Sequence, residues 1–369
     1  MAGTCYPHVA DVDLIRTYLK NNNWALSKKI KQANLIIITT CAFSEEAEGK
    51  SFEAIKRVQK EKNKAARVIV TGCLPSINNL KLRSVFDGVI ISANSLREFN
   101  GLLNAKSMIG DVKYTGSPRY LKRNRNGTYR LRIGWGCSGK CSYCAVKFVF
   151  GKPYSRSISD ILIEFNIACA KGYRKFILVA NDAGSYGEDL GTSLPCLLRE
   201  LCRRNRDCKF LLSHLTPSKL KEMLPSLKAL VRSGKICQMN VPVESGSNRI
   251  IRLMNRSYTV DDFKYCIEKL TGYNSNLRLL TDVMVGFPSE TEQDFLETSK
   301  LVEWLGRNNV VFHNLSYSPR PNTEASKLPG QIDQITKSVR LKKIARLSEI
   351  SYLLRNKGLF GKIKRKRIF

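Results

Sequence analysis

The chain has 369 residues, of which 43% are hydrophobic and 25% are charged, and 62 basic against 31 acidic residues give a formal net charge of +31. Enough apolar side chains are present for a core, which excludes a disordered polyelectrolyte, and the length predicts two or three domains. No apolar run of about 18 residues and no secretory signal pattern are present, so we expect a cytoplasmic protein without membrane spans. In that reducing compartment, we expect the 12 cysteines to be metal ligands or buried thiols.

The first third of the chain alternates between predicted strands and helices. Short β-branched runs at 35–40, 67–71 and 88–92 are typical of buried strands. A helix is predicted at 12–20, and Ser44 can cap another helix that has acidic residues in its first turn. The alternation predicts an α/β domain with a mostly parallel sheet, which we assign to residues 1–110.

The rest of the chain predicts a second α/β domain. Glycine, proline, asparagine and many basic residues at 111–128 indicate a basic linker. Six strand–helix units over 129–330 predict an open, partial (β/α)6 barrel, and 331–369 is expected to be a basic helix followed by a flexible basic tail. The predicted strands are 129–135, 175–180, 210–213, 238–243, 277–285 and 310–317, and the predicted helices are 159–171, 195–204, 218–231, 260–270 and 292–306.

The strongest chemical signal is a loop of three cysteines. Cys137, Cys141 and Cys144 have Cys-x3-Cys-x2-Cys spacing and directly follow a predicted strand. Three thiolates in this spacing can bind three irons of a [4Fe–4S] cluster and leave the fourth iron open to a chelating ligand. In parallel α/β proteins, ligands bind beyond the carboxyl ends of strands, where this loop is expected. A tetrahedral zinc site is the alternative, but a nearby fourth Cys or His is missing.

A second, dispersed triad consists of Cys5, Cys41 and Cys73. Cys41 and Cys73 each follow a predicted strand, and Cys5 precedes the first predicted helix. Because parallel strands bring their carboxyl ends to one edge of a sheet, these thiols can converge on a second cluster with one open iron. Separate buried thiols that only pack are the alternative.

Both triads together resemble the radical S-adenosyl-L-methionine (SAM) methylthiotransferase family. The loop of three cysteines, with Tyr143 before the third, is the signature of the radical SAM superfamily. The resemblance covers nearly the whole chain and implies an N-terminal Rossmann-like parallel sheet domain followed by a radical SAM partial barrel. The stretches that match family motifs, in order, are 5–13, 40–42, 71–75, 179–187, 241–247, 282–292 and 319–323.

The resemblance implies a sulfur transferase with two [4Fe–4S] clusters and SAM. The loop cysteines would hold the cluster that cleaves SAM to a 5′-deoxyadenosyl radical, and the dispersed triad would hold an auxiliary cluster. A sulfur methylated at the auxiliary cluster would then be transferred to a substrate carbon that has lost its hydrogen to the radical. An electron donor such as flavodoxin or ferredoxin is implied as a partner.

Polar residues near predicted strand ends are candidates to bind SAM. Capping and turn chemistry is the alternative for the Asn, Asp and Ser residues among them. His214 can contact SAM or substrate, or can be an ordinary strand-end histidine, and Lys147 and Arg156 can bind phosphate or carboxylate, or be solvated. The six remaining cysteines are interpreted as packing. The candidates for SAM are Tyr143, Asn181, Asp182, Glu244, Ser245 and Asp282.

The sequence departs from the family pattern in four ways. Three are substitutions: His8 replaces the usual Asn, Glu244 replaces the usual Gln, and Phe150 replaces a frequent Arg. The fourth is that no alternating β pattern of a C-terminal RNA-binding TRAM domain follows Arg320. We expect the role of that domain to be absent or replaced by the basic tail. The strand that usually precedes Cys5 is expected to be truncated or missing.

Several substrates fit these observations. The stretch 180–200 most resembles the branch that modifies N6-threonylcarbamoyladenosine next to the tRNA anticodon, and the charge of +31 suits RNA. A protein or ribosomally made peptide is the alternative, favoured by the missing TRAM pattern, and a basic enzyme can hold an acidic peptide. A small molecule is a third possibility. A non-catalytic iron–sulfur or RNA-binding protein is the fourth, and retention of both triads argues against it.

Overall fold

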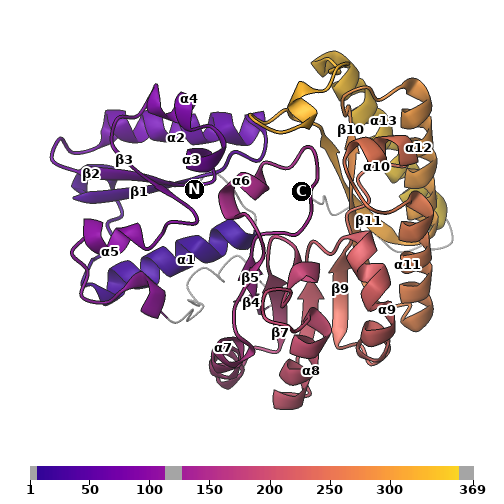
Figure 1. The fold of residues 1–369 in the computed structure, drawn as a ribbon, viewed down its shortest axis with the longest axis horizontal. Helices are drawn as coiled ribbons and strands as arrows, with labels where there is room; N and C mark the ends of the chain where they lie inside the picture. The colour runs from indigo at the N-terminus through magenta and orange to yellow at the C-terminus, as the bar shows by residue number, and fades with distance from the viewer. Residues whose placement is uncertain (1–5, 113–126, 357–369) are drawn as a thin grey trace.

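The computed structural model describes residues 6–112 and 127–356, which form an α/β structure built on two parallel sheets (Figure 1). The predicted fold class is confirmed. A three-stranded sheet has the order β1-β2-β3, and a six-stranded sheet has the order β11-β10-β9-β8-β7-β4. A short antiparallel pair joins β5 (Gly134–Trp135) to β6 (Tyr154–Ser155). The domain limits given above stay predictions.

The three-stranded sheet is covered on both faces because its strands are apolar at consecutive positions. In β2 (Arg67–Gly72), Val68 and Val70 pack in a cluster with α2 (Glu45–Glu61), whereas Ile69 packs in a second cluster with α1 (Tyr6–Asn21) and α5 (Glu98–Leu102). Successive strand residues point to opposite faces, which explains the two clusters. The other strands are β1 (Leu35–Thr40) and β3 (Val89–Ser92), and α3 (Leu74–Ile77) and α4 (Asn79–Arg83) follow β2.

The six-stranded sheet is an open barrel. Its strands follow each other in chain order, every pair is parallel, and β4 and β11 are its two edges. Apolar residues of the strands and the crossover helices form one large core. The strands are β4 (Thr128–Arg132), β7 (Lys175–Val179), β8 (Lys209–Leu212), β9 (Ile236–Asn240), β10 (Arg278–Val285) and β11 (Val310–Ser316). The crossover helices are α7 (Ile158–Ala170), α8 (Leu194–Arg204), α9 (Pro217–Arg232), α11 (Val260–Tyr273) and α12 (Glu292–Arg307).

Some local elements differ from the sequence prediction. The strand predicted at 129–135 is divided, because β4 ends at Arg132 and β5 turns to pair with β6 instead. The short helices α6 (Val146–Phe150) and α10 (Asn248–Leu253) were not predicted. The closing basic helix is α13 (Gln334–Asn356), while most of the predicted linker and the basic tail lie outside the described residues. In the part that is described, no helix is long and apolar enough to cross a membrane.

Three phenylalanines form an aromatic cluster within the barrel core. The ring centroids of Phe165 and Phe176 lie 4.6 Å apart, and each ring lies 6.2 Å from that of Phe210. All three side chains are fully buried. We predict that Phe165→Ala lowers the free energy of unfolding by about 3–5 kcal/mol, because it leaves a cavity in this cluster. Urea unfolding of the full chain measures this change.

The control for this prediction lies on the same helix. Ile163 is 48% exposed, so Ile163→Ala should change the free energy of unfolding by less than about 0.5 kcal/mol. Equal losses of stability in the two variants would contradict the assignment of the phenylalanine cluster as the core of the barrel.

Candidate functional site

The loop of three cysteines connects β5 to α6 at the carboxyl end of the barrel, and two glycines shape it. Gly136 has a φ of +73°, and a Cβ there would lie 2.1 Å from the carbonyl oxygen of Lys152. A Cβ on Gly139 would lie 3.1 Å from the Cys137 Sγ and 3.7 Å from the Cys141 Sγ. Gly136 therefore lets the chain turn, and Gly139 keeps free the space beside two thiols.

The environment of the thiols fits an iron–sulfur cluster. Burial raises the pKa of the Cys137 thiol to about 12, and the Asp182 carboxylate, 3.8 Å from its Sγ, adds to this. Burial likewise raises the pKa of Cys141 and of Cys144. Three thiolates here need positive charge between them, which the irons of a cluster supply. Among the described residues, no three Cys, His, Asp or Glu side chains converge on one metal ion.

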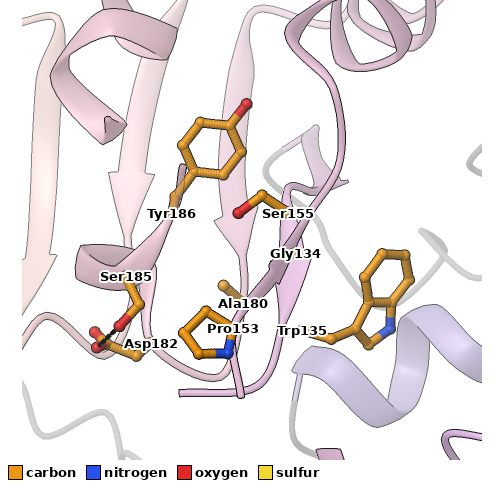
Figure 2. A pocket seen from close by; sticks show the side chains of 8 residues that line it. All are labelled: Gly134, Trp135, Pro153, Ser155, Ala180, Asp182, Ser185 and Tyr186. Atoms are coloured by element: carbon orange, nitrogen blue, oxygen red, sulfur yellow. Dashed lines mark hydrogen bonds between the residues drawn. The ribbon is translucent and has the colours of Figure 1, made fainter. Parts of the chain in front are cut away.

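Asn181 and Asp182 follow β7 and contact the cysteine loop. The Asn181 Oδ1 accepts a hydrogen bond from the Gly136 N–H at 3.0 Å. The buried Asp182 accepts from the Ser185 hydroxyl at 2.6 Å, and the Ser138 and Ser185 hydroxyl oxygens lie 2.8 Å apart. Figure 2 shows Asp182 and Ser185 at one side of a small hollow that reaches Trp135 and Tyr186. These two candidates for SAM binding therefore support the loop through turn chemistry.

The cysteine loop is held from the opposite side by a buried network around Arg256. The Tyr143 hydroxyl donates to the Glu244 Oε1 at 2.9 Å, and Arg256 donates to both of these groups. The Arg256 guanidinium lies 5.7 Å from the centre of the Tyr143 ring and 5.8 Å from that of Tyr258. Burial raises the pKa of Glu244, and Arg256 opposes that rise. Glu244 thus joins the segment after β9 to the loop.

Sequence reasoning missed Arg256, although a signal was present. Glu244 replaces a neutral Gln of the family pattern, and a buried carboxylate requires a cationic partner. Ser245, the other candidate in this stretch, is fully buried. Its hydroxyl lies 3.2 Å from that of Thr298 and accepts from the Ser247 N–H at 3.1 Å. Ser245 therefore shapes the turn before α10.

A group of polar residues lies on the inner face of the barrel. Leu279 and Val283 belong to the core against the helices, so alternation turns Asp282 to the opposite face. The Asp282 Oδ2 accepts from the Asn240 amide at 3.1 Å, and its Oδ1 lies 3.0 Å from the Nδ1 of His313. Asp282 is the one SAM candidate on this face, and no motif pointed to His313.

Two further atoms of this group have unused hydrogen-bonding capacity. The Asn240 Oδ1 and the His214 Nδ1 are buried and bond no described residue. Burial lowers the pKa of His214, and the nearby Asp282 and Asp182 carboxylates oppose this shift. Buried polar atoms without a partner are costly, so such atoms next to Asp282 and His313 are typical of a site that binds a polar ligand. These four residues are called the inner polar group below.

Two members of the dispersed triad lie at one edge of the three-stranded sheet. Thr40 pairs in register with Gly72, and Cys41 and Cys73 are the next residues of each strand. The Cys73 N–H donates to the Thr40 carbonyl at 3.0 Å. Gly72 permits this approach, because its φ is +105° and a Cβ would lie 2.3 Å from the Thr40 oxygen. Cys5 lies outside the described residues.

The two basic candidates form ion pairs, and two of the remaining cysteines contact each other. Lys147 pairs with Glu324 at 3.1 Å, and Arg156 pairs with the buried Glu164. Among the cysteines interpreted as packing, the Sγ atoms of Cys169 and Cys208 lie 3.7 Å apart. Both basic side chains therefore pair with carboxylates of the chain itself.

Comparison with known proteins finds two family models. The model described as the radical SAM superfamily matches residues 131–302, and the model described as uncharacterized protein family UPF0004 matches residues 3–92. The two matched ranges contain the loop cysteines and the dispersed triad, respectively.

Curated relatives match most of the chain. A tRNA-2-methylthio-N(6)-dimethylallyladenosine synthase of Caldicellulosiruptor saccharolyticus is 31% identical over 97% of this chain and 79% of its own length. The threonylcarbamoyladenosine tRNA methylthiotransferase MtaB of Thermotoga maritima is 28% identical, over 88% of this chain and 76% of its own. The ribosomal protein uS12 methylthiotransferase RimO of Protochlamydia amoebophila is 27% identical, over 97% and 77%.

Solved structures share the fold. The radical SAM methyltransferase TsrM from Kitasatospora setae, with tryptophan substrate and a SAM analogue bound, superposes with a TM-score of 0.63 at 14% identity. The match covers 86% of this chain and 72% of TsrM. At this identity the similarity extends to the fold alone.

The glycines of the cysteine loop give a direct test of the site. We predict that Gly136→Ala lowers the iron and acid-labile sulfide bound per chain after anaerobic reconstitution, because the added Cβ clashes with the Lys152 carbonyl and displaces the loop. Gly191→Ala is the matched control: Gly191 also has a positive φ, of +64°, but no heavy atom lies within 4 Å of its Cβ position. Equal iron content in the two variants and the unaltered chain would disprove the role of Gly136.

Proposed function

Because the chain belongs to the radical SAM methylthiotransferase family, we propose that it inserts a methylthio group at an unactivated C–H of a tRNA adenosine next to the anticodon, of the N6-threonylcarbamoyladenosine type. The observation that carries the proposal is the presence of two cysteine sites, one at the carboxyl end of each sheet. Cys137, Cys141 and Cys144 would hold one [4Fe–4S] cluster. Cys5, Cys41 and Cys73 would hold a second, auxiliary cluster.

When bound, the clusters and SAM supply the radical chemistry and the sulfur, and the protein supplies position and shielding from water. Asn181 and Asp182 hold the cysteine loop from the β7 side, and the network of Tyr143, Glu244 and Arg256 holds it from the β9 side. In this proposal, these residues position SAM indirectly, by fixing the loop. Asp282 is the SAM candidate with a carboxylate on the inner face.

The substrate class is proposed from charge, relatives and the inner polar group. The net charge of +31 suits a polyanion such as tRNA, and two of the relatives above are named for tRNA. Those two names differ in the substituent on the adenosine. The buried Asn240 Oδ1 and His214 Nδ1, which bond no described residue, would hydrogen-bond a threonylcarbamoyl group, whereas a dimethylallyl group carries no hydrogen-bonding atom. This favours the threonylcarbamoyl substrate.

A protein or peptide side chain is the second candidate. The relative named RimO acts, by its name, on ribosomal protein uS12, and the net charge of +31 suits an acidic segment. With either substrate, we propose that the enzyme is cytoplasmic and receives electrons from a donor such as flavodoxin or ferredoxin.

The two cysteine triads should have separable roles. We predict that alanine at Cys137, Cys141 and Cys144 reduces cleavage of SAM to 5′-deoxyadenosine to background. Alanine at Cys41 and Cys73 should leave this cleavage intact but stop methylthio transfer, because only the auxiliary cluster is lost. Both products are measured by mass spectrometry after anaerobic reconstitution. Methylthio transfer by the Cys41/Cys73 variant would refute an auxiliary cluster there.

The substrate is tested by mass spectrometry of tRNA nucleosides from the host with and without the gene. We predict that deletion removes one methylthiolated species, 2-methylthio-N6-threonylcarbamoyladenosine, and that the gene restores it. Plasmid-borne genes for the loop-cysteine variant and the unaltered protein form the matched pair. An unchanged nucleoside profile would overturn the tRNA proposal and direct the search to methylthiolated proteins.

A further inference from the structure

A short segment after the last barrel strand contacts both cysteine-bearing regions. This segment, residues 317–328, is called the strap. On the side of Cys41, the Ser318 hydroxyl accepts from the Glu45 N–H at 2.9 Å, and Arg320 donates to the Glu48 carboxylate at 2.6 Å. Both Arg320 and Glu48 are buried, although they lie 272 positions apart in the sequence. In Figure 1 the strap, where orange turns to yellow, reaches toward the indigo helix α2.

The same strap contacts the loop that carries Cys141 and Cys144. The Ala325 N–H donates to the carbonyl of Ser142, between these two cysteines, at 2.9 Å. Glu324 pairs with Lys147, three residues after Cys144, at 3.1 Å. One continuous segment of the chain therefore contacts both regions.

Glu48 connects the strap to the Cys73 side as well. Its carboxylate accepts from the Asn78 amide at 3.2 Å and pairs with Lys81 at 3.0 Å. Asn78 follows α3, the short helix that begins directly after Cys73. Glu48 thus joins the helix after Cys41, the helix after Cys73 and the strap at one buried carboxylate.

Hydrogen bonds within the strap and apolar packing against the barrel make it rigid. The Thr323 hydroxyl donates to the Arg320 carbonyl at 2.8 Å, and Ser326 donates to the Thr323 carbonyl at 2.7 Å. Tyr317 and Ala325 pack in a small core with residues of the barrel. A rigid segment anchored on the barrel can transmit position from one cysteine region to the other.

We propose that the strap sets the position of the Cys41–Cys73 edge relative to the cysteine loop, with Arg320 as the positioning residue. The inference rests on the proposed function, in which a substrate carbon activated at one cluster must meet sulfur at the other. Transfer between two sites is sensitive to placement, since a displacement of about 1 Å can cost about 100-fold in rate. Loss of the strap contacts therefore uncouples SAM cleavage from sulfur transfer.

The test uses Arg320→Met in the full-length, reconstituted protein. Methionine keeps much of the volume, and Glu48 retains Asn78 and Lys81 as partners, so little charge is left unpaired. We expect the ratio of 5′-deoxyadenosine to methylthiolated product to rise by about tenfold or more. We also expect faster hydrogen exchange of the amides at 41–48 and 142–147, with that of β7 and β8 unchanged.

The chain offers a matched control in Arg340. This arginine is also buried and also pairs with a buried carboxylate, that of Glu290, at 2.6 Å, but that pair joins α13 to the barrel. Arg340→Met should lower thermal stability to a similar degree without changing the product ratio. Arg320→Lys should restore part of the coupling, because it keeps the positive charge.

Three outcomes overturn the proposal. They are an unchanged product ratio in Arg320→Met, an equal rise in Arg340→Met, and unchanged exchange at 41–48 and 142–147. If Arg320→Met fails to fold, Arg320→Lys and Glu48→Gln are compared by the same readouts. Absence of methylthiolated product from the unaltered chain would refute the proposed function instead, and the exchange measurement then still decides whether the strap links the two regions.

Discussion

Two buried arginine–carboxylate pairs join the three-stranded sheet to the open barrel. Arg132, at the end of β4, donates to Asp11 on α1, and Arg320 donates to Glu48 on α2. Burial raises the pKa of Asp11 to about 6, and Arg132 opposes this rise. A buried charge without its partner is very unfavourable, so each pair limits how the three-stranded sheet and the barrel can lie relative to one another. The rest of the site depends on this constraint, because Cys41 and Cys73 follow strands of the three-stranded sheet, whereas the cysteine loop belongs to the barrel.

The polar residues near the strand ends divide into two kinds. Asn181, Asp182, Glu244 and Ser245 form hydrogen bonds to loops and turns around the site. The inner polar group instead presents hydrogen-bonding atoms toward the inner face of the barrel. This division is physically reasonable, since a loop that must hold a cluster needs rigid support before it can present a reactive iron.

Local features were predictable from the sequence, and long-range pairs were not. The run at 35–40 coincides with β1, and the predicted barrel strands lie within a few residues of those observed. The signal for these strands is local, because it consists of β-branched runs bounded by turn residues that are close in sequence. The spacing of the loop cysteines is also local. Arg256, His313 and the strap could not be predicted in the same way. Their partners are distant in the chain or depend on strand register, and Arg320 and Glu48 are 272 positions apart.

The most direct test of methylthio transfer to tRNA is a turnover with a deuterium-labelled substrate. The unaltered, reconstituted protein is given SAM and an anticodon stem-loop whose N6-threonylcarbamoyladenosine carries deuterium at C2 of the adenine. We predict that deuterium appears in 5′-deoxyadenosine and that a methylthio group replaces it on the same carbon. Formation of 5′-deoxyadenosine without deuterium, together with unmodified RNA, would contradict the claim that the two cysteine regions act on one tRNA adenosine.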